Sequence, residues 1–409
     1  MIHRARWALP IDRPPLAGGW VESENGRIVR IGDGKPPGPA DDLGDVAILP
    51  GLVNAHTHLE LAWMAGRVPP SPSMDAWIGA LLSSRRAGPS GGEAEVLEAM
   101  ARAAVTMHAT GTVLVGDISN TLLSPRVLAA AGLGGVVFHE LLGFNTADPN
   151  RQVKEAWARV AVTAHHLQNP QHPKNLQHPQ ELRFSVVAHA PYSVSPSLFI
   201  AIANRAGDTP LTVHLGESAE EIEFLETGGG PIRRTLEALG VWVETWEPPA
   251  CDPVRYMENL GYLQPGTLVV HGVHLTDDAL ERLWKAQAVL VACPRSNLWV
   301  GAGAPRLAHF YSSRAPVAIG TDSLASAPTL NMFDELAEMR RLAPEVAAAT
   351  LLDSATRRGA VALGFGDDYG TLAPRKRAAL VAVEVPGSVG DVEEYLVSGI
   401  APETIRRVA

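Results

Sequence analysis

Cysteine is nearly absent from this sequence, and so is any long hydrophobic run. Two cysteines, Cys251 and Cys293, cannot build a disulfide framework and are too few for a cysteine-based zinc site. No uncharged apolar run reaches the roughly 18 residues that a membrane span needs. The opening residues, Met-Ile-His-Arg-Ala-Arg-Trp, lack the apolar core of a signal peptide. These absences predict a soluble, cytoplasmic protein with no membrane partner.

Positive charge is also scarce. The 34 basic residues are outnumbered by 44 acidic ones, the formal net charge is −10, and no basic patch stands out. Nucleic-acid binding therefore has no electrostatic support. The remaining composition, 46% hydrophobic and 19% charged over 409 residues, is typical of two or three globular domains or of one α/β barrel with additions.

Eight short, nearly apolar runs rich in valine or isoleucine alternate with helical patterns. They are Gly51–His56, Thr112–Asp117, Gly135–His139, Phe184–His189, Leu211–His214, Leu268–His271, Val289–Ala292 and Val317–Gly320. Parallel strands that are buried on both faces have this composition. Eight βα units predict an α/β fold, a (β/α)8 TIM barrel with insertions. A doubly wound open sheet is the alternative, but no G-x-G-x-x-G follows the first run.

Three other segments depart from this alternation. Residues 1–50 and the residues from 366 onward hold short strand-like pieces between Gly- and Pro-rich turns, so both ends are predicted to be β-structure. Residues 165–180 contain four histidines, four glutamines and three prolines. A metal-storage role is conceivable for this segment. We favour a solvent-exposed insertion, because proline prevents both helix and strand.

Ionisable side chains gather at the predicted strand ends, where a barrel carries its chemistry. The first run ends in His56-Thr57-His58, three later runs end at His189, His214 and His271, and Asp322 follows the eighth. One histidine at such a place is usually structural, but their joint occurrence favours a site.

A metal centre can be assembled from these residues. His56 and His58 are two apart on a strand and so lie on one side of it. Together with His214 and Asp322 they offer three nitrogens and one oxygen, which suits zinc and could also hold ferrous iron. Bound zinc lowers the pKa of its water to about 7, so that hydroxide is available.

A proton carrier stands close by in the sequence. Glu217 follows His214 by three residues and could move a proton between water and a substrate. Alternatively, it only favours the start of the helix predicted over residues 219–227. We favour catalysis, with His271 as a group that orients the water.

Motifs along nearly the whole chain resemble the amidohydrolase superfamily. They are Leu49–Glu60 (LPGLVNAHTHLE), His189–Ser193 (HAPYS), His214–Ser218 (HLGES), Val270–Leu275, Cys293–Asn297 and Gly320–Ser326. They are similar to the branch that holds chlorohydrolases and deaminases. The second and third motifs, with Glu220–Leu225 and Gly229–Pro231, look most like aminodeoxyfutalosine deaminases.

The resemblance implies a distorted barrel over residues 51–365 and a small β-sandwich domain built from residues 1–50 and 366–409. It also implies a set of site residues, namely His56, His58, His214 and Asp322 as metal ligands, Glu217 as proton shuttle, His271 and Asp322 as further catalytic groups, and His189 against the substrate. Many relatives carry a bridging lysine on the fourth strand, but Arg183–His189 contains none, which implies one metal ion. In two other motifs, Ala292 and Ala379 replace the usual His and Asp.

The activity implied is hydrolytic deamination of the adenine moiety of a nucleoside, best 6-aminodeoxyfutalosine to futalosine in menaquinone biosynthesis. Alternatives are the deamination of S-adenosylhomocysteine, methylthioadenosine or adenosine, a chlorohydrolase or cyclic-amide hydrolase with the same metal site, and a scaffold without activity. For the substrate we expect Glu60 to accept hydrogen bonds from ribose hydroxyls and Trp63 or Trp77 to stack on rings. A homodimer is the expected assembly.

Overall fold

The structure is a computed structural model, and it describes residues 1–167 and 181–408. Most of the predicted insertion at 165–180 therefore lies outside the described residues. Within the described ranges, no helix is both long and apolar enough to cross a bilayer.

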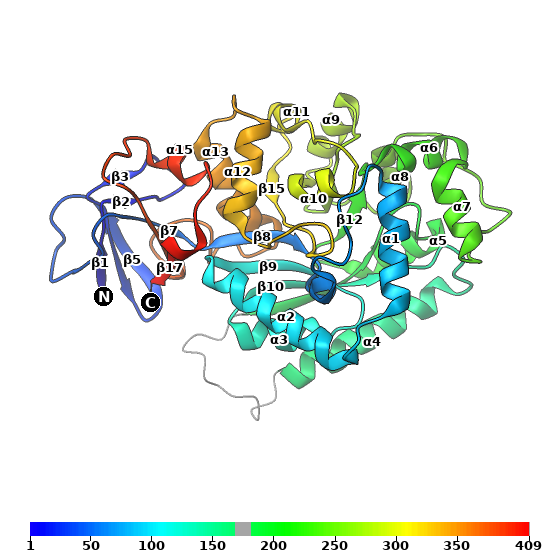
Figure 1. Ribbon diagram of the computed structural model, residues 1–409, viewed down its shortest axis with the longest axis horizontal. Coiled ribbons are helices and arrows are strands. Elements are labelled where there is room, and N and C mark those ends of the chain that lie inside the picture. The colour runs from blue at the N-terminus through cyan, green and yellow to red at the C-terminus, as the bar shows by residue number, and fades with distance from the viewer. Residues whose placement is uncertain (168–180, 409) are drawn as a thin grey trace.

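The larger of the two regions of the fold is built around eight parallel strands. They form two four-stranded sheets of order β11-β10-β9-β8 and β12-β13-β14-β15 (Figure 1). Their bounds are β8 Leu52–Thr57, β9 Thr112–Ser119, β10 Gly134–Leu141, β11 Leu182–Ala188, β12 Thr212–Leu215, β13 Leu268–His271, β14 Val289–Ala292 and β15 Val317–Ile319. Each strand coincides with one predicted run to within two residues at either end. The prediction of the strands is therefore confirmed.

Backbone hydrogen bonds also cross both seams between these sheets. Where β11 meets β12, His214 N donates to His189 O over 2.9 Å. Where β15 meets β8, Asp322 N donates to His56 O over 3.1 Å. The second seam requires Gly320, because a Cβ there would lie 2.7 Å from the Cβ of His56. The eight strands thus form a TIM-barrel-like α/β domain, with His189, His214, His56 and Asp322 at its seams.

Helices cover the outside of these strands. They are η1 Leu59–Met64, α1 Met74–Ala87, α2 Gly92–Ala109, α3 Ser124–Ala131, α4 Pro149–Leu167, α5 Pro196–Ala206, α6 Ala219–Thr227, α7 Gly230–Ala238, α8 Pro253–Asn259, α9 Asp277–Lys285, α10 Pro294–Trp299, α11 Leu307–Ser312, α12 Met332–Leu342, α13 Ala348–Asp353, η2 Ser354–Arg358 and α14 Gly359–Ala362. Because both faces of the sheets are covered, every residue of β8, β9 and β10 is buried, which explains their continuous apolar sequences.

Both ends of the chain meet in two further sheets at one end of the molecule (Figure 1). The strands are β1 Ile2–Arg4, β2 Trp7–Ala8, β3 Leu16–Ala17, β4 Trp20–Glu24, β5 Arg27–Gly32, β6 Asp41–Asp42, β7 Val46–Pro50, β16 Leu380–Glu384 and β17 Ile405–Val408, beside α15 Val392–Leu396 and η3 Pro402–Thr404. β7 pairs antiparallel with β16, which joins the two ends directly. Val21 and Ile28 of one sheet share an apolar cluster with Ile48 and Ala382 of the other. Both ends are β-structure, as predicted.

Candidate metal centre and active site

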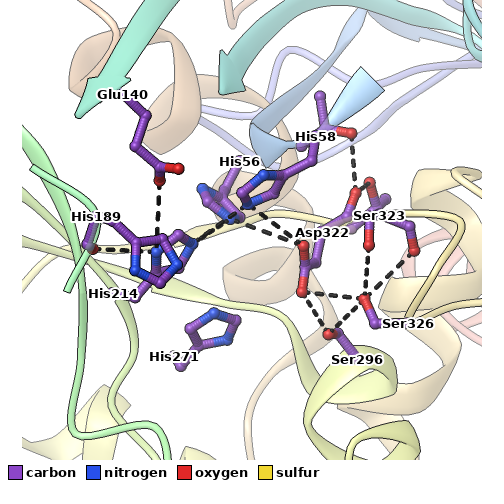
Figure 2. A network of polar contacts seen from close by, with 12 residues as sticks. His56, His58, Glu140, His189, His214, His271, Ser296, Asp322, Ser323 and Ser326 are labelled. Atoms are coloured by element: carbon purple, nitrogen blue, oxygen red, sulfur yellow. Dashed lines mark hydrogen bonds and ion pairs between the residues drawn. The ribbon is translucent and has the colours of Figure 1, made fainter. Parts of the chain in front are cut away.

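Three histidines converge at the carboxyl ends of β8 and β12. Figure 2 shows the rings of His56, His58 and His214 directed toward one another. The Nε2 atom of His214 lies 3.2 Å from Nε2 of His56 and 3.3 Å from Nε2 of His58. The pleat of β8 places His56 and His58 on one side, as predicted. Nitrogen atoms at these separations can share one cation.

These histidines are held in the form that binds metals. Burial, followed by the neighbouring His189, lowers the pKa of His214 to about 4, and burial lowers the pKa of His58 to about 3. Both rings are therefore neutral at pH 7. His214 Nδ1 donates to His189 O over 3.1 Å, which leaves the lone pair of Nε2 facing the other two rings.

Asp322 completes the donor set from the loop that follows β15, beside His56. Its Oδ1 lies 3.6 Å from Nε2 of His58 and 4.0 Å from Nε2 of His56. Its Oδ2 is occupied, because Ser296 Oγ donates to it over 2.6 Å and Ser326 Oγ over 3.0 Å (Figure 2). The two serines thereby fix which carboxylate oxygen faces the histidines. Three nitrogens and one oxygen fit a divalent ion such as zinc.

His271 and Glu217 lie next to this donor set. His271 Nε2 is 3.5 Å from Glu217 Oε1, and Asn297 Nδ2 donates to His271 Nδ1 over 2.9 Å. Burial lowers the pKa of His271 to about 3, so its ring is neutral and carries its proton on Nε2. Burial, followed by Asp322, raises the pKa of Glu217 well above its usual range. Glu217 is therefore a carboxylic acid that can give a proton.

The loop that carries Glu217 is fixed by a second carboxylate. Glu221 accepts hydrogen bonds from the backbone N–H groups of Gly216, over 2.8 Å, and of Glu217, over 3.0 Å. Gly216 has φ +62°, a conformation that glycine adopts without strain, and a Cβ there would lie 2.5 Å from Leu275. The position of Glu217 is thus set by the loop and does not depend on a substrate.

Two of the functional residues have a strained backbone. His271 has φ +76° and Asp322 has φ +58°. Left-handed conformations cost non-glycine residues about 1–3 kcal/mol, and they are concentrated at functional sites. Both residues stand where a strand gives way to its loop, so the strain turns their side chains toward the histidines.

The comparison with known proteins identifies the family. The model of the amidohydrolase family matches residues 47–400. The chain belongs to the amidohydrolase family. It is 30% identical over 345 residues to an aminodeoxyfutalosine deaminase of Deinococcus radiodurans, with 80% of this chain and 76% of the relative covered. It is also 30% identical over 366 residues to a 5-methylthioadenosine/S-adenosylhomocysteine deaminase of Nitratidesulfovibrio vulgaris, covering 84% and 73%.

Solved amidohydrolase-like structures share the fold. The aminofutalosine deaminase of Helicobacter pylori, solved in complex with methylthio-coformycin, has a TM-score of 0.83 at 24% identity and covers 100% of both chains. An adenosine deaminase of Xanthomonas campestris with bound zinc has a TM-score of 0.76 at 24% identity, covering 99% of this chain and 90% of its own. At these identities the likeness shows the fold alone. The family resemblance drawn from the sequence motifs is confirmed.

A cavity of about 210 Å³ opens over the amidohydrolase site. His58, His214, His271, Glu217 and Asp322 all line it. The structure therefore brings three of the predicted ligands and the predicted proton carrier to one cavity, together with His271, and the fourth predicted ligand, His56, lies directly behind it against His214.

His189 also lines the cavity, as predicted for a residue that contacts the substrate. Its Nδ1 is 2.6 Å from Ser193 Oγ, and burial lowers its pKa to about 4. Its ring is therefore neutral and turned by Ser193, so that it can exchange hydrogen bonds with a ligand.

The structure does not bring Glu60 or Trp63 to the cavity. The Glu60 carboxylate accepts hydrogen bonds from Ser119 Oγ, over 2.5 Å, and from the N–H and Oγ1–H groups of Thr121. It therefore holds the loop after β9 and has little capacity left for a ribose. Trp63 packs beneath Arg67, whose guanidinium lies 5.0 Å from the ring centre. Trp77, the other aromatic residue considered, does line the cavity.

Glu140 is a functional candidate that the sequence did not reveal. It is the last residue but one of β10, lines the cavity, and has Oε1 3.8 Å from Nδ1 of His214. The predicted run stopped one residue earlier, at His139, whose Nδ1 instead contacts Ser119 O over 2.9 Å. Because side chains alternate along a strand, extending the run by one residue would have found Glu140.

Proposed function

We propose that this amidohydrolase is a metal-dependent aminohydrolase that converts the adenine moiety of a nucleoside into hypoxanthine and releases ammonia. The observation that carries the proposal is the placement of Glu217 beside His271, in the cavity that His58, His214 and Asp322 also line. The net reaction replaces the amino group on C6 with oxygen from water, so it requires a group that gives a proton and a group that takes one.

His56, His58, His214 and Asp322 would hold one divalent ion, and zinc is the ion that this set of donors favours. When bound, such an ion supplies Lewis acidity that makes hydroxide available from water at neutral pH. The seven residues of β11 include no lysine, which supports one ion. Metal analysis of the purified protein would separate zinc from iron.

The residues of this chain would then divide the proton transfers. Glu217 gives a proton to the ring nitrogen N1, because burial keeps its carboxyl protonated. Asp322 takes a proton from the attacking water through Oδ1, the oxygen that the serines leave free, and returns it to the departing amine. As the carbonyl of hypoxanthine forms, the C6 hydroxyl returns its proton to the Glu217 carboxylate, which restores the starting state. His271 orients the water through Nε2, and His189 contacts the substrate.

Among adenine nucleosides we propose 6-aminodeoxyfutalosine, with futalosine as the product, in a route to menaquinone. The support is the aminodeoxyfutalosine deaminase of Deinococcus radiodurans among the relatives that are 30% identical. The second candidate is 5-methylthioadenosine or S-adenosylhomocysteine, because a deaminase named for these substrates is equally similar.

Ammonia release from a panel of adenine nucleosides tests the proposal. The highest kcat/KM is expected for 6-aminodeoxyfutalosine. Equal or better turnover of plain adenosine would refute the choice of substrate, and chloride release from a chlorotriazine without any deamination would refute the choice of reaction.

The proposal extends to the architecture and the assembly. We propose that the two terminal sheets form a β-sandwich domain of residues 1–50 and 366–409, supported by their common apolar cluster, and that residues 51–365 form a closed barrel. A homodimer is proposed because two-fold dimers are the commonest assemblies of soluble enzymes. Light scattering tests the dimer.

A further inference from the structure

One wall of the cavity is almost entirely apolar. Its residues are Met74, Trp77, Ile78, Leu81 and Leu82 of α1, Ile232 and Leu236 of α7, and Leu239, which directly follows α7. Such a surface gains free energy by covering an apolar group of a ligand, about 25 cal/mol for each Å² removed from water.

A single cation interrupts this wall. Arg85, in the last turn of α1, is the one lysine or arginine among the residues that line the cavity. Within residues 1–167 and 181–408, its guanidinium takes part in no hydrogen bond and no ion pair. A ligand that covers Arg85 without offering an acceptor would strip water from an unpaired charge, which is costly.

The charge of Arg85 reaches the strand ends. It acts on the pKa of His58, of His189 and of Glu140, so the guanidinium lies within electrostatic range of all three. Glu140 does not neutralise it, because no ion pair joins them and Asn120 Nδ2 donates to Glu140 Oε2 over 3.0 Å. The start of α1 carries the carboxyl group of Asp75, so along this wall an anionic ligand group is favoured only beside Arg85.

We infer that Arg85 binds a carboxylate carried at the end of an apolar 5′ substituent of the adenine nucleoside. This inference rests on the proposed function, which puts the adenine ring at the strand ends. The 5′ substituent then lies along α1, its apolar part covers Trp77, Ile78 and Leu81, and its carboxylate meets the guanidinium. A planar guanidinium binds a carboxylate through two parallel hydrogen bonds. A phosphate dianion would need further donors, which the apolar wall lacks.

Two matched probes test this inference, namely 5′-S-(carboxyphenyl)-5′-thioadenosine and the same compound with a carboxamide in place of the carboxylate. Wild-type enzyme is expected to prefer the carboxylate in kcat/KM by roughly 10- to 100-fold, the range for a hydrogen bond to a charged group. Arg85→Met should remove this preference, mainly through KM, and Arg85→Lys should restore part of it. Arg86→Met, which changes a neighbouring residue that does not line the cavity, is the matched control.

Each alternative outcome is decisive. Equal loss on both probes in Arg85→Met would mean that Arg85 supports the fold of α1 and does not read the carboxylate. A wild-type preference for adenosine 5′-monophosphate over the carboxylate probe would mean that the anion is a phosphate. Wild-type enzyme that contains metal but turns over none of 6-aminodeoxyfutalosine, the two probes and 5-methylthioadenosine would overturn the proposed function itself. Turnover of both probes at equal rates would overturn only the inference about Arg85.

Discussion

The floor of the cavity and its wall are built in opposite ways. The floor is formed by His58, His214, His271 and Asp322 at strand ends, with His56 behind them, and hydrogen bonds fix these side chains. The wall is formed by α1 and α7. Most of their side chains that line the cavity are apolar, and the exception discussed above, Arg85, is exposed to solvent. Rigid strand ends suit a reaction that needs fixed distances between the reacting groups. Because the wall is separate, its residues can differ between enzymes with different substrates without changing those distances.

The largest effect is expected at the floor, from Glu217→Gln. Glutamine keeps the size of the side chain but cannot give the proton, so kcat for ammonia release should fall by about 10²–10⁴-fold. Bound metal should stay equimolar, because Glu217 is not among the proposed ligands. Glu226→Gln on the exposed side of α6 is the control. A Glu217→Gln enzyme with more than a tenth of the wild-type rate would disprove the proton transfer.

A smaller effect is expected from the serines behind the floor. Replacing Ser296 and Ser326 with alanine leaves Oδ2 of Asp322 without its two donors, so the carboxylate can rotate. Residues of this kind change metal affinity by about 10- to 100-fold. Competition with a chelator measures this affinity. The control is Ser312→Ala, which removes an exposed hydroxyl remote from the site and should leave the metal affinity unchanged. Unchanged affinity in the double variant would show that the serines do not position Asp322.

At the wall, Leu81→Ala should change substrate binding and not the chemical step. Loss of its apolar area should raise KM for a nucleoside with an apolar 5′ substituent by roughly fivefold, with kcat retained. Steady-state kinetics with 5-methylthioadenosine and adenosine measure the difference. If kcat falls as far as KM rises, the division between floor and wall is not valid.

The residues of the floor could be predicted because the pattern that marks them lies within a few neighbouring residues of the sequence. Valine- and isoleucine-rich runs mark buried parallel strands, and the residue that ends each run must face the active site. His56, His214 and Asp322 were all found in this way. The serine contacts to Asp322 were not, because they join α10 to a loop that is distant in the chain. Glu60 was placed at a ribose from its position after β8, but the loop after β9 takes up its carboxylate. Of the wall, only Trp77 was considered from the sequence, since packing determines how α1 and α7 lie over the strand ends.

The last effect expected is on stability and not on turnover or binding, and it separates the floor from the wall once more. Asp117 lies under the floor at β9, where it accepts a hydrogen bond from Leu59 N over 2.9 Å. Burial raises the pKa of Asp117 to about 8, above its value in the unfolded chain. Its contribution to the free energy of unfolding is therefore fully present below about pH 4 and is lost as the pH rises toward 8, by about 1 kcal/mol per pH unit.

Asp117→Asn keeps the acceptor but cannot ionise, so it should reduce this pH dependence between pH 5 and 8. Urea unfolding at several pH values measures the change, and Asp75→Asn at the start of α1 should not alter it, because no buried carboxyl is removed there. Parallel pH dependence in wild type and Asp117→Asn would mean that Asp117 is ionised in the folded protein.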